Sequence, residues 1–354
     1  MTASSAVLAP PARLGVHATS LADHRLAPAA AVALAAQHGF TACLFNSVFD
    51  VSPRLDAGEI TGLAALAADL GVTVTVGSVS LHPFRASSDR RLLVAGDGDA
   101  LAGLRRMLEA SALLPDRDLL TIIGRIEDRH DRLVPWPEQL RAAGDLLGRL
   151  APLLRDTGMR LAVKTHEEIT RAEAARLVDA AGDDVAGVAL DPVNLLVNLD
   201  DPVRTARELG GVVTQVIVDD GVLVMTDGAV RRLLCPVGEG IVDWPGVRAA
   251  TGGRQPTWWV ELHRGQFTLA PFDMDWIFHH PDLTREELGA GVRHVLAATR
   301  RLDAGRIRRL SAAQACPAGR LAATTAATCE LLALPSGPTA SFGVRASNNR
   351  STSD

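Results

Sequence analysis

The sequence has no tyrosine, only four cysteines and no long apolar run. No stretch approaches the roughly 20 consecutive apolar residues that cross a bilayer, so we expect no membrane association. The cysteines form no CxxC pair and have no spacing with histidines that suits zinc. We therefore expect neither a disulfide framework nor a zinc finger. Because alanine, arginine, glycine and leucine are abundant, the lack of tyrosine indicates a compositional bias of the genome rather than a function.

An excess of basic residues is also missing. The formal net charge is −5 and the pI is near 6.1, whereas a protein that binds a phosphate backbone needs a basic face. We therefore expect no nucleic-acid partner. The N-terminal stretch "MTASSAVLAPPARLG" lacks a basic segment followed by a long apolar one, so no signal peptide is predicted. These observations predict a cytoplasmic protein.

What the sequence does have is a regular alternation of strand-like and helix-like segments. The 354 residues are 47% hydrophobic and 22% charged, as in ordinary globular proteins. Eight short apolar runs predict strands, most of them followed by an Ala/Leu-rich helical stretch: "RLGVHAT", "TACLFNS", "VTVTVGSVSL", "LLTIIGRI", "RLAVKTH", "VAGVALD", "VTQVIVDD" and "TWWVELH". Eight such units favour a closed (β/α)8 TIM barrel over an open sheet.

The domain boundaries follow from where this alternation starts and stops. We expect an N-terminal arm over residues 1–12, the barrel over 13–310 and an irregular C-terminal extension over 311–354. The extension is predicted to be largely disordered because it ends in Ser, Asn, Gly and Thr, with a short helix around 319–334.

Three helix starts carry capping-box patterns, in which side chains satisfy the free amides of the first turn. They are Asp56 with Glu59, Thr170 with Glu173, and Thr284 with Glu287.

Charged residues gather at the ends of three predicted strands, where the working residues of a barrel lie. Side chains alternate along a strand, so residues two apart share a face. Lys164 and His166 therefore share one face of "RLAVKTH", and Glu261 and His263 share one face of "WWVELH". Asp191 ends "VAGVALD" above small residues. We expect these side chains to point into the barrel.

Three stretches resemble a known family. "VALDPVNLLVNLDDPV" resembles its sixth-strand pattern, "CPVGEGIVDWPGV" its Gly-Glu-Gly loop, and "WWVELH" its last strand. The family is that of the xylose isomerase-like TIM barrels, also called sugar phosphate isomerases/epimerases. The resemblance covers residues 160–300 well. The first half of the chain matches the family mainly in its alternation of strand-like and helix-like segments.

The resemblance implies a divalent metal, Mn²⁺, Mg²⁺ or Zn²⁺, held by a Glu, an Asp, a His and a Glu on the fifth to eighth strands. Asp191 and Glu261 stand at two of these positions as metal ligands. The fifth-strand Glu falls on Lys164 and the seventh-strand His on Ile217, while a family lysine falls on Asp219. Two carboxylates alone are a poor ligand set for zinc or manganese. The resemblance implies no organic cofactor.

Lys164 has several interpretations. Two facing carboxylates need a cation between them, so Lys164 could replace the metal and polarise a substrate carbonyl while a carboxylate removes the adjacent proton. A Schiff-base role would need a lowered pKa, which neighbouring acids oppose. A metal could instead recruit His166, Glu167 or Glu168 as ligands. Finally, Lys164 could be an ion-paired structural residue in a barrel that has lost catalysis.

We predict Lys164, His166 and Glu261 as catalytic residues, and four further residues as substrate ligands: Asn194, His263, Glu239 and Asp219. For Asn194 the alternative is ordinary turn chemistry, and for His263 a place on the barrel rim. Side chains of neighbouring residues point apart more often than together, so His279 and His280 are not assigned to the site.

The favoured function is that of a sugar (phosphate) isomerase or epimerase working through an enediolate on a sugar or keto-sugar. A lyase or decarboxylase would pass through the same intermediate. A non-catalytic sugar- or partner-binding barrel stays an alternative, because the residues at two of the four metal-ligand positions differ from those of the family. A DNA-repair endonuclease is a poorer alternative, because no basic groove is visible in the sequence. The resemblance also implies a homodimer.

Overall fold

A computed structural model describes residues 12–334 except for 23, 79, 227, 254, 266 and 314–316. The predicted N-terminal arm, apart from its last residue, and the last twenty residues of the predicted extension lie outside the described residues. None of the helices that the structure describes is long and apolar enough to cross a membrane.

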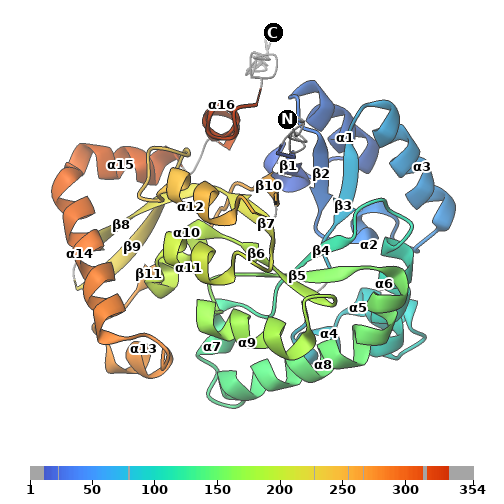
Figure 1. Cartoon of the computed structure of the whole chain (residues 1–354), viewed down its shortest axis with the longest axis horizontal. Coiled ribbons are helices and arrows are strands. Elements are labelled where there is room, and N and C mark those ends of the chain that lie inside the picture. The colour runs from blue at the N-terminus through green and yellow to red at the C-terminus, as the bar shows by residue number, and fades with distance from the viewer. Residues whose placement is uncertain are drawn as a thin grey trace, which may run out of the picture.

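Eight parallel strands form a nearly closed barrel (Figure 1). In chain order they are β1 (Leu14–His17), β2 (Ala42–Phe45), β3 (Thr73–Val76), β4 (Asp118–Thr121), β5 (Arg160–Lys164), β6 (Ala186–Leu190), β7 (Val213–Val218) and β10 (Thr257–Val260). They are arranged β3-β2-β1-β10-β7-β6-β5-β4, and a single parallel bridge between Gly77 and Leu120 joins the two edges. All eight predicted strands and the TIM-barrel prediction are confirmed.

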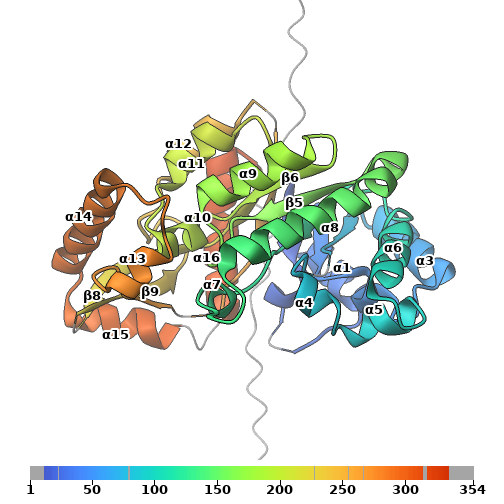
Figure 2. The ribbon, with the colours of Figure 1, turned by 90° about the horizontal axis from the view of Figure 1, so that it is seen from below.

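Helices surround the barrel on its outer side (Figures 1 and 2). The longer ones are α1 (Pro28–Gln37), α3 (Ala57–Asp69), α6 (Ala100–Ser111), α8 (Trp136–Thr157), α9 (Arg171–Ala181), α11 (Pro202–Leu209) and α12 (Trp244–Thr251). Shorter segments in the loops are η1 (Ala18–Ser20), α2 (Val48–Val51), α4 (Pro83–Ala86), α5 (Arg90–Ala95), α7 (Ile126–Arg129), α10 (Pro192–Leu195) and η2 (Leu196–Asn198). Thr170 and Glu173 form the predicted reciprocal capping box of α9.

The barrel interior is narrow and is filled by one apolar layer. Its members come from six of the eight strands: Ala42, Leu44, Leu120, Ala162, Ala189, Ile217 and Trp259. Trp259 takes the space that a side chain at position 15 would need, because a Cβ on Gly15 would lie 2.2 Å from its Cζ3 atom. Small residues on β5 and β6 thus leave room for one large ring, and the charged residues lie above this layer.

A second, three-stranded sheet is added between the seventh and eighth barrel strands. It consists of β8 (Asp220–Thr226), β9 (Ala229–Cys235) and, after the barrel is complete, β11 (Thr268–Leu269), in the order β11-β9-β8 with antiparallel pairing. The helices α13 (Met274–Phe278), α14 (Arg285–Arg301) and α15 (Ala304–Ala313) follow. α14 packs on β8 and α15 on β9, to one side of the barrel (Figure 2). Thr284 and Glu287 cap α14 reciprocally, as predicted.

The chain then returns to the barrel through α16 (Pro317–Leu332), which packs near β10. This helix agrees with the one expected around residues 319–334. The additional sheet was not predicted from the sequence, although it brings a side chain to the site described next.

Candidate functional site

Lys164 is the last residue of β5 and its side chain is 3% exposed. Its Nζ atom lies 3.0 and 2.9 Å from the two carboxylate oxygens of Glu261 and 3.1 Å from Oδ2 of Asp191. The ammonium group therefore lies between the two carboxylates at the carboxyl ends of β5, β6 and β10. The sequence prediction that these three side chains meet inside the barrel agrees with this geometry.

The charges of this cluster are fixed by mutual attraction. Burial alone would lower the pKa of Lys164, but the charges of Glu261 and Asp191 outweigh it and raise the pKa. Burial would raise the pKa of Glu261, yet Lys164 and His263 bring it down to about 2. The pKa of Asp191 is likewise lowered by His263 and Lys164 against its burial. All three shifts favour the charged forms of these groups at neutral pH.

His263 adds a second cation to the cluster. Its Nε2 atom is 2.9 Å from Oδ2 of Asp191, and its Nδ1 atom is 3.1 Å from Oδ2 of Asp219. Burial lowers the pKa of an imidazole, but Asp191 raises that of His263 to about 9. His263 is therefore an imidazolium at neutral pH, held by a carboxylate on each ring nitrogen.

Asn194 contacts this network from the turn after β6. Its Nδ2 atom donates to Oδ2 of Asp191 at 2.9 Å, and Arg232 of β9 donates to its side-chain oxygen. Arg232 is fully buried and lies over the ring of Phe267, 4.6 Å from its centroid. The added sheet thus supplies a guanidinium that orients Asn194, a contact that sequence analysis missed.

A further guanidinium reaches the site from α16. Arg320 lies 3.6 Å from Oδ2 of Asp219 and donates to the carbonyl oxygen of His263. Its side chain is 7% exposed. Arg320 lies in the helix expected around residues 319–334, for which no site residue was predicted, and no sequence pattern signals its contact.

His166 lies apart from this network and pairs with its own neighbours. Nδ1 is 2.5 Å from Glu168 and Nε2 is 2.9 Å from Glu167. Burial opposes protonation, but Glu168 raises the pKa of His166 to about 10. Because β5 ends at Lys164, strand alternation no longer sets the direction of a side chain two residues further on. The catalytic role of His166 stays a prediction without a direct contact to Lys164 or Glu261 among the described interactions.

Glu239 lies in the exposed Gly-Glu-Gly turn, where its carboxylate is 3.7 Å from Arg306 of α15. The turn instead wraps a buried acid, Asp220, which accepts hydrogen bonds from the Gly238 amide at 3.1 Å and from Trp244 Nε1 at 3.0 Å. A Cβ on Gly240 would lie 1.9 Å from Oδ1 of Asp220. Packing against Asp220 therefore explains Gly240, whereas Gly238 has a positive φ of 86°. The role of Glu239 as a substrate ligand stays a prediction.

A pocket of about 510 Å³ opens beside the cluster, at the ends of β1, β2 and β10. Glu261 and His263 form part of its wall, and Asn46, Arg25 and Arg264 provide further polar groups. A cavity of this size suits a small ligand. A molecule bound there would face the carboxylate of Glu261 and the ring of His263, while Lys164 is nearly covered.

Two features of the sequence were not used in predicting the site: the single lysine and the histidine that ends the first strand. Lys164 is the only lysine among the 36 lysine and arginine residues of the chain. His17, at the end of β1, is 4% exposed and close enough to Glu261, Lys164 and His263 to interact electrostatically with each. Burial lowers the pKa of His17, so it is a neutral hydrogen-bonding group next to the ion cluster.

A divalent metal does not fit at the family position. The ammonium of Lys164 already bonds the two carboxylates that would be ligands, and Ile217, at the position of the family histidine, is buried in the apolar layer. In the part of the chain that the structure describes, two groups of three residues have ligand atoms within 4.8 Å of one another, and neither contains Asp191 or Glu261. One is His166 with Glu167 and Glu168; the other is His130 with Asp275 and His279.

Comparison with known proteins defines the class. The model of the xylose isomerase-like TIM barrel family matches residues 32–261, and the chain belongs to this family. No curated protein matches the sequence.

Solved structures agree in fold at low identity. A D-psicose 3-epimerase from Clostridium cellulolyticum H10, solved with D-tagatose, is similar with a TM-score of 0.55 and 14% identity over 81% of this chain and 98% of that one. The IOLI protein, solved with a zinc atom, gives 0.52 and 15% over 82% and 99%. A fusion of a xylose isomerase-like barrel with a 4-hydroxyphenylpyruvate dioxygenase gives 0.51 and 19% over 71% of this chain, which spans 39% of the fusion protein. At these identities the likeness extends to the fold.

Proposed function

We propose that the chain is an isomerase- or epimerase-like enzyme that transfers a proton next to the carbonyl of a small polyhydroxylated substrate, with Lys164 in place of the family's metal ion. One observation supports this most strongly. The only lysine of the chain lies within 3.1 Å of both carboxylates that stand at metal-ligand positions. A compact ammonium with three donors suits such a place better than the planar guanidinium that the chain uses elsewhere.

Glu261 is the proposed proton acceptor, because its charged carboxylate forms part of the pocket wall. His263, an imidazolium on the same wall, would donate a hydrogen bond to the substrate carbonyl and stabilise the enediolate. A carboxylate with a pKa of about 2 is a weak base. The mechanism therefore requires that the substrate oxygen accepts a hydrogen bond that Lys164 or His263 otherwise donates to a carboxylate. The loss of that bond raises the pKa of Glu261.

The test is solvent deuterium exchange into a panel of ketoses and keto-sugar acids, followed by NMR, with protein dialysed against a chelator. We expect exchange that survives chelation and is lost in Glu261→Gln and in Lys164→Met. Arg176→Gln, which breaks only a surface ion pair with Asp282, is the matched control and should keep full exchange. Exchange that requires an added metal, or that persists in Lys164→Met, would refute the proposal. Release of carbon dioxide or cleavage of the substrate would identify a decarboxylase or lyase acting through the same intermediate.

A non-catalytic sugar-binding barrel is the second candidate. It is favoured by the closed network of ion pairs, in which Lys164 and both ring nitrogens of His263 already have protein partners. Binding of a sugar by calorimetry without any exchange would support it. The expected homodimer and cytoplasmic location stay predictions.

A further inference from the structure

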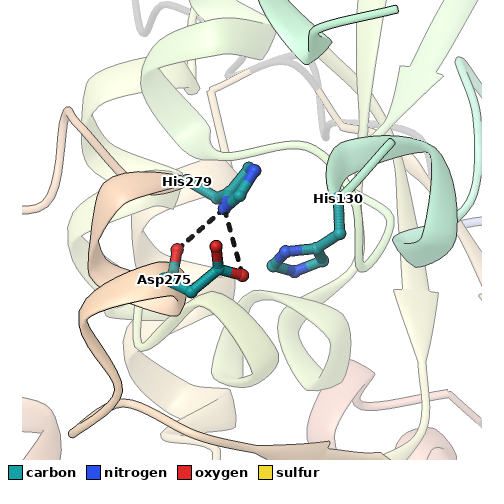
Figure 3. Close-up of side chains that lie close together, drawn as sticks. All are labelled: His130, Asp275 and His279. Carbon is teal, nitrogen blue, oxygen red and sulfur yellow. Dashed lines mark hydrogen bonds and ion pairs between the residues drawn. The ribbon is translucent and has the colours of Figure 1, made fainter. Parts of the chain in front are cut away.

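Three potential metal ligands, none of them part of the ion cluster of Lys164, lie close together (Figure 3). His130 follows α7, while Asp275 and His279 lie one turn apart on and just after α13. One ligand atom of each residue lies within 4.8 Å of those of the other two. The imidazole rings of His130 and His279 are 4.6 Å apart at their centroids.

The two segments are held in place by a buried neighbour. Arg129, which precedes His130, is fully buried and lies 2.7 Å from Glu173 of α9. It donates a second bond to the Glu168 carbonyl oxygen at 2.7 Å and a third to the carbonyl oxygen of His279. The backbones of α7 and α13 are therefore tied together next to the three ligands. A site whose ligands are already placed loses little conformational freedom when an ion binds.

The ligand types suit a transition metal. Two imidazoles and one carboxylate are a common protein donor set for Zn²⁺, with water completing a tetrahedron. His130 and His279 are partly exposed and Asp275 is exposed, so an ion and its water can enter from solvent. We propose that His130, Asp275 and His279 bind a divalent transition-metal ion such as Zn²⁺, independently of the site in the barrel.

Asp275 and His279 contact each other and one exposed arginine. Nδ1 of His279 bonds the carbonyl oxygen of Asp275 at 2.7 Å, and the carboxylate of Asp275 is 3.9 Å from the exposed Arg132. The adjacent His280 differs, because it is buried and both of its ring nitrogens have partners, the Trp276 carbonyl oxygen and the Asn198 side chain. Of the two neighbouring histidines, His279 is the one that can bind an ion.

An ion at this position would join the added helices to the barrel. Asp275 and His279 belong to the segment that leads into α14, whereas His130 belongs to the loop after β4. A ligand that binds only the folded chain stabilises it in proportion to the logarithm of its free concentration. Zn²⁺ should therefore raise the melting temperature of the chain.

Titration calorimetry with ZnCl₂ on untagged, chelator-treated full chain tests the proposal. His279→Ala, His130→Ala and Asp275→Asn are compared with His294→Ala, which removes an exposed histidine of α14. We expect each of the two histidine variants to bind one Zn²⁺ fewer per chain than the wild type, and Asp275→Asn to bind it about tenfold more weakly or not at all. The His294 variant should bind as the wild type does.

Counting the difference in bound ions keeps this site distinct from His166, Glu167 and Glu168, because an ion bound there would stay in all these variants. Circular dichroism melts without metal show whether a variant is folded, and His279→Gln replaces His279→Ala if it is not. Unchanged stoichiometry and affinity in the His130 and His279 variants, or no binding by the wild type, would overturn the proposal.

Discussion

The carboxylate of Asp219 binds His263 twice. Its Oδ2 atom accepts a hydrogen bond from the backbone amide of His263 at 2.8 Å and lies 3.1 Å from the ring Nδ1. Asp219 follows β7 and His263 follows β10, so these contacts join the ends of the two strands next to the site. Since the other ring nitrogen is 2.9 Å from Asp191, the imidazolium has little freedom to turn.

Asp219→Asn should lower the pKa of His263 from about 9. The amide removes one negative charge next to the ring while keeping the shape of the side chain. The pKa is measured by NMR titration of the imidazole protons. An unchanged pKa would show that Asp191 alone determines the charge of His263.

Lys164→Met should destabilise the fold by about 3–5 kcal/mol, because it leaves the buried Asp191 and the partly buried Glu261 without their cation. The measurement is the free energy of unfolding in urea. Arg176→Ala, which breaks the surface pair with Asp282, should cost about 1 kcal/mol or less. Adding Glu261→Gln to Lys164→Met should recover part of the loss, and a loss as small as that of the surface control would show that the buried pair is not a net stabiliser.

Stability should fall in alkaline solution. The pKa of His263 is raised from 6.5 to about 9 and that of His166 to about 10. A raised pKa contributes stability fully below the unfolded value of 6.5, and this contribution is lost as the pH rises through the folded value. Glu261, with a pKa lowered from 4.5 to about 2, has the opposite sign. Its contribution is fully present above 4.5 and is lost as the pH falls from there through about 2. Urea midpoints across the alkaline range check this, and the double variant His166→Gln/His263→Gln should flatten the curve.

No covalent adduct should form on Lys164. Its raised pKa keeps the amine protonated and therefore without the lone pair that attacks a carbonyl. Borohydride reduction in the presence of a ketose should leave the mass of the Lys164 peptide unchanged. Because the chain has a single lysine, a mass increase on this peptide would be unambiguous and would establish the Schiff-base alternative.

Gly15→Ala should destabilise the barrel by about 1–3 kcal/mol, since the new methyl group would lie 2.2 Å from the Trp259 ring. Gly148→Ala is the matched control in α8, where a Cβ meets nothing within 4 Å. Alanine in a helix should stabilise there by about 0.5–1 kcal/mol. Thermal melts of both variants measure the difference, and equal melting temperatures would contradict the packing of Trp259 in the barrel.

Strand positions and the direction of strand side chains could be predicted because they follow local rules. Ala162, Ala189 and Trp259 each lie two residues before Lys164, Asp191 and Glu261, so alternation places them on the interior face too, as the apolar layer confirms. The same rule says less about His166, since it applies only while the backbone stays extended and β5 ends at Lys164. Beyond the end of β5 the turn of the chain, set by tertiary contacts, determines where the side chain goes.

The added sheet could have been predicted, because Asp227-Gly228 separates two apolar runs in the sequence and such a pair is a common hairpin turn. The contacts that Arg232 and Arg320 make with the site could not. Both arginines approach from elements outside the repeating barrel units. Neither has a local pattern that distinguishes it from the many surface arginines of the chain.

The position of Arg320 has a consequence for how the protein is made. A ribosome has produced every barrel strand once β10 is complete, yet the guanidinium that faces Asp219 is added only with α16. In folding that begins during synthesis, the barrel strands can therefore pair before Arg320 reaches Asp219. A chain clipped ahead of α16 would contain all eight barrel strands but lack one of the two cationic side chains that face Asp219, with His263 as the other.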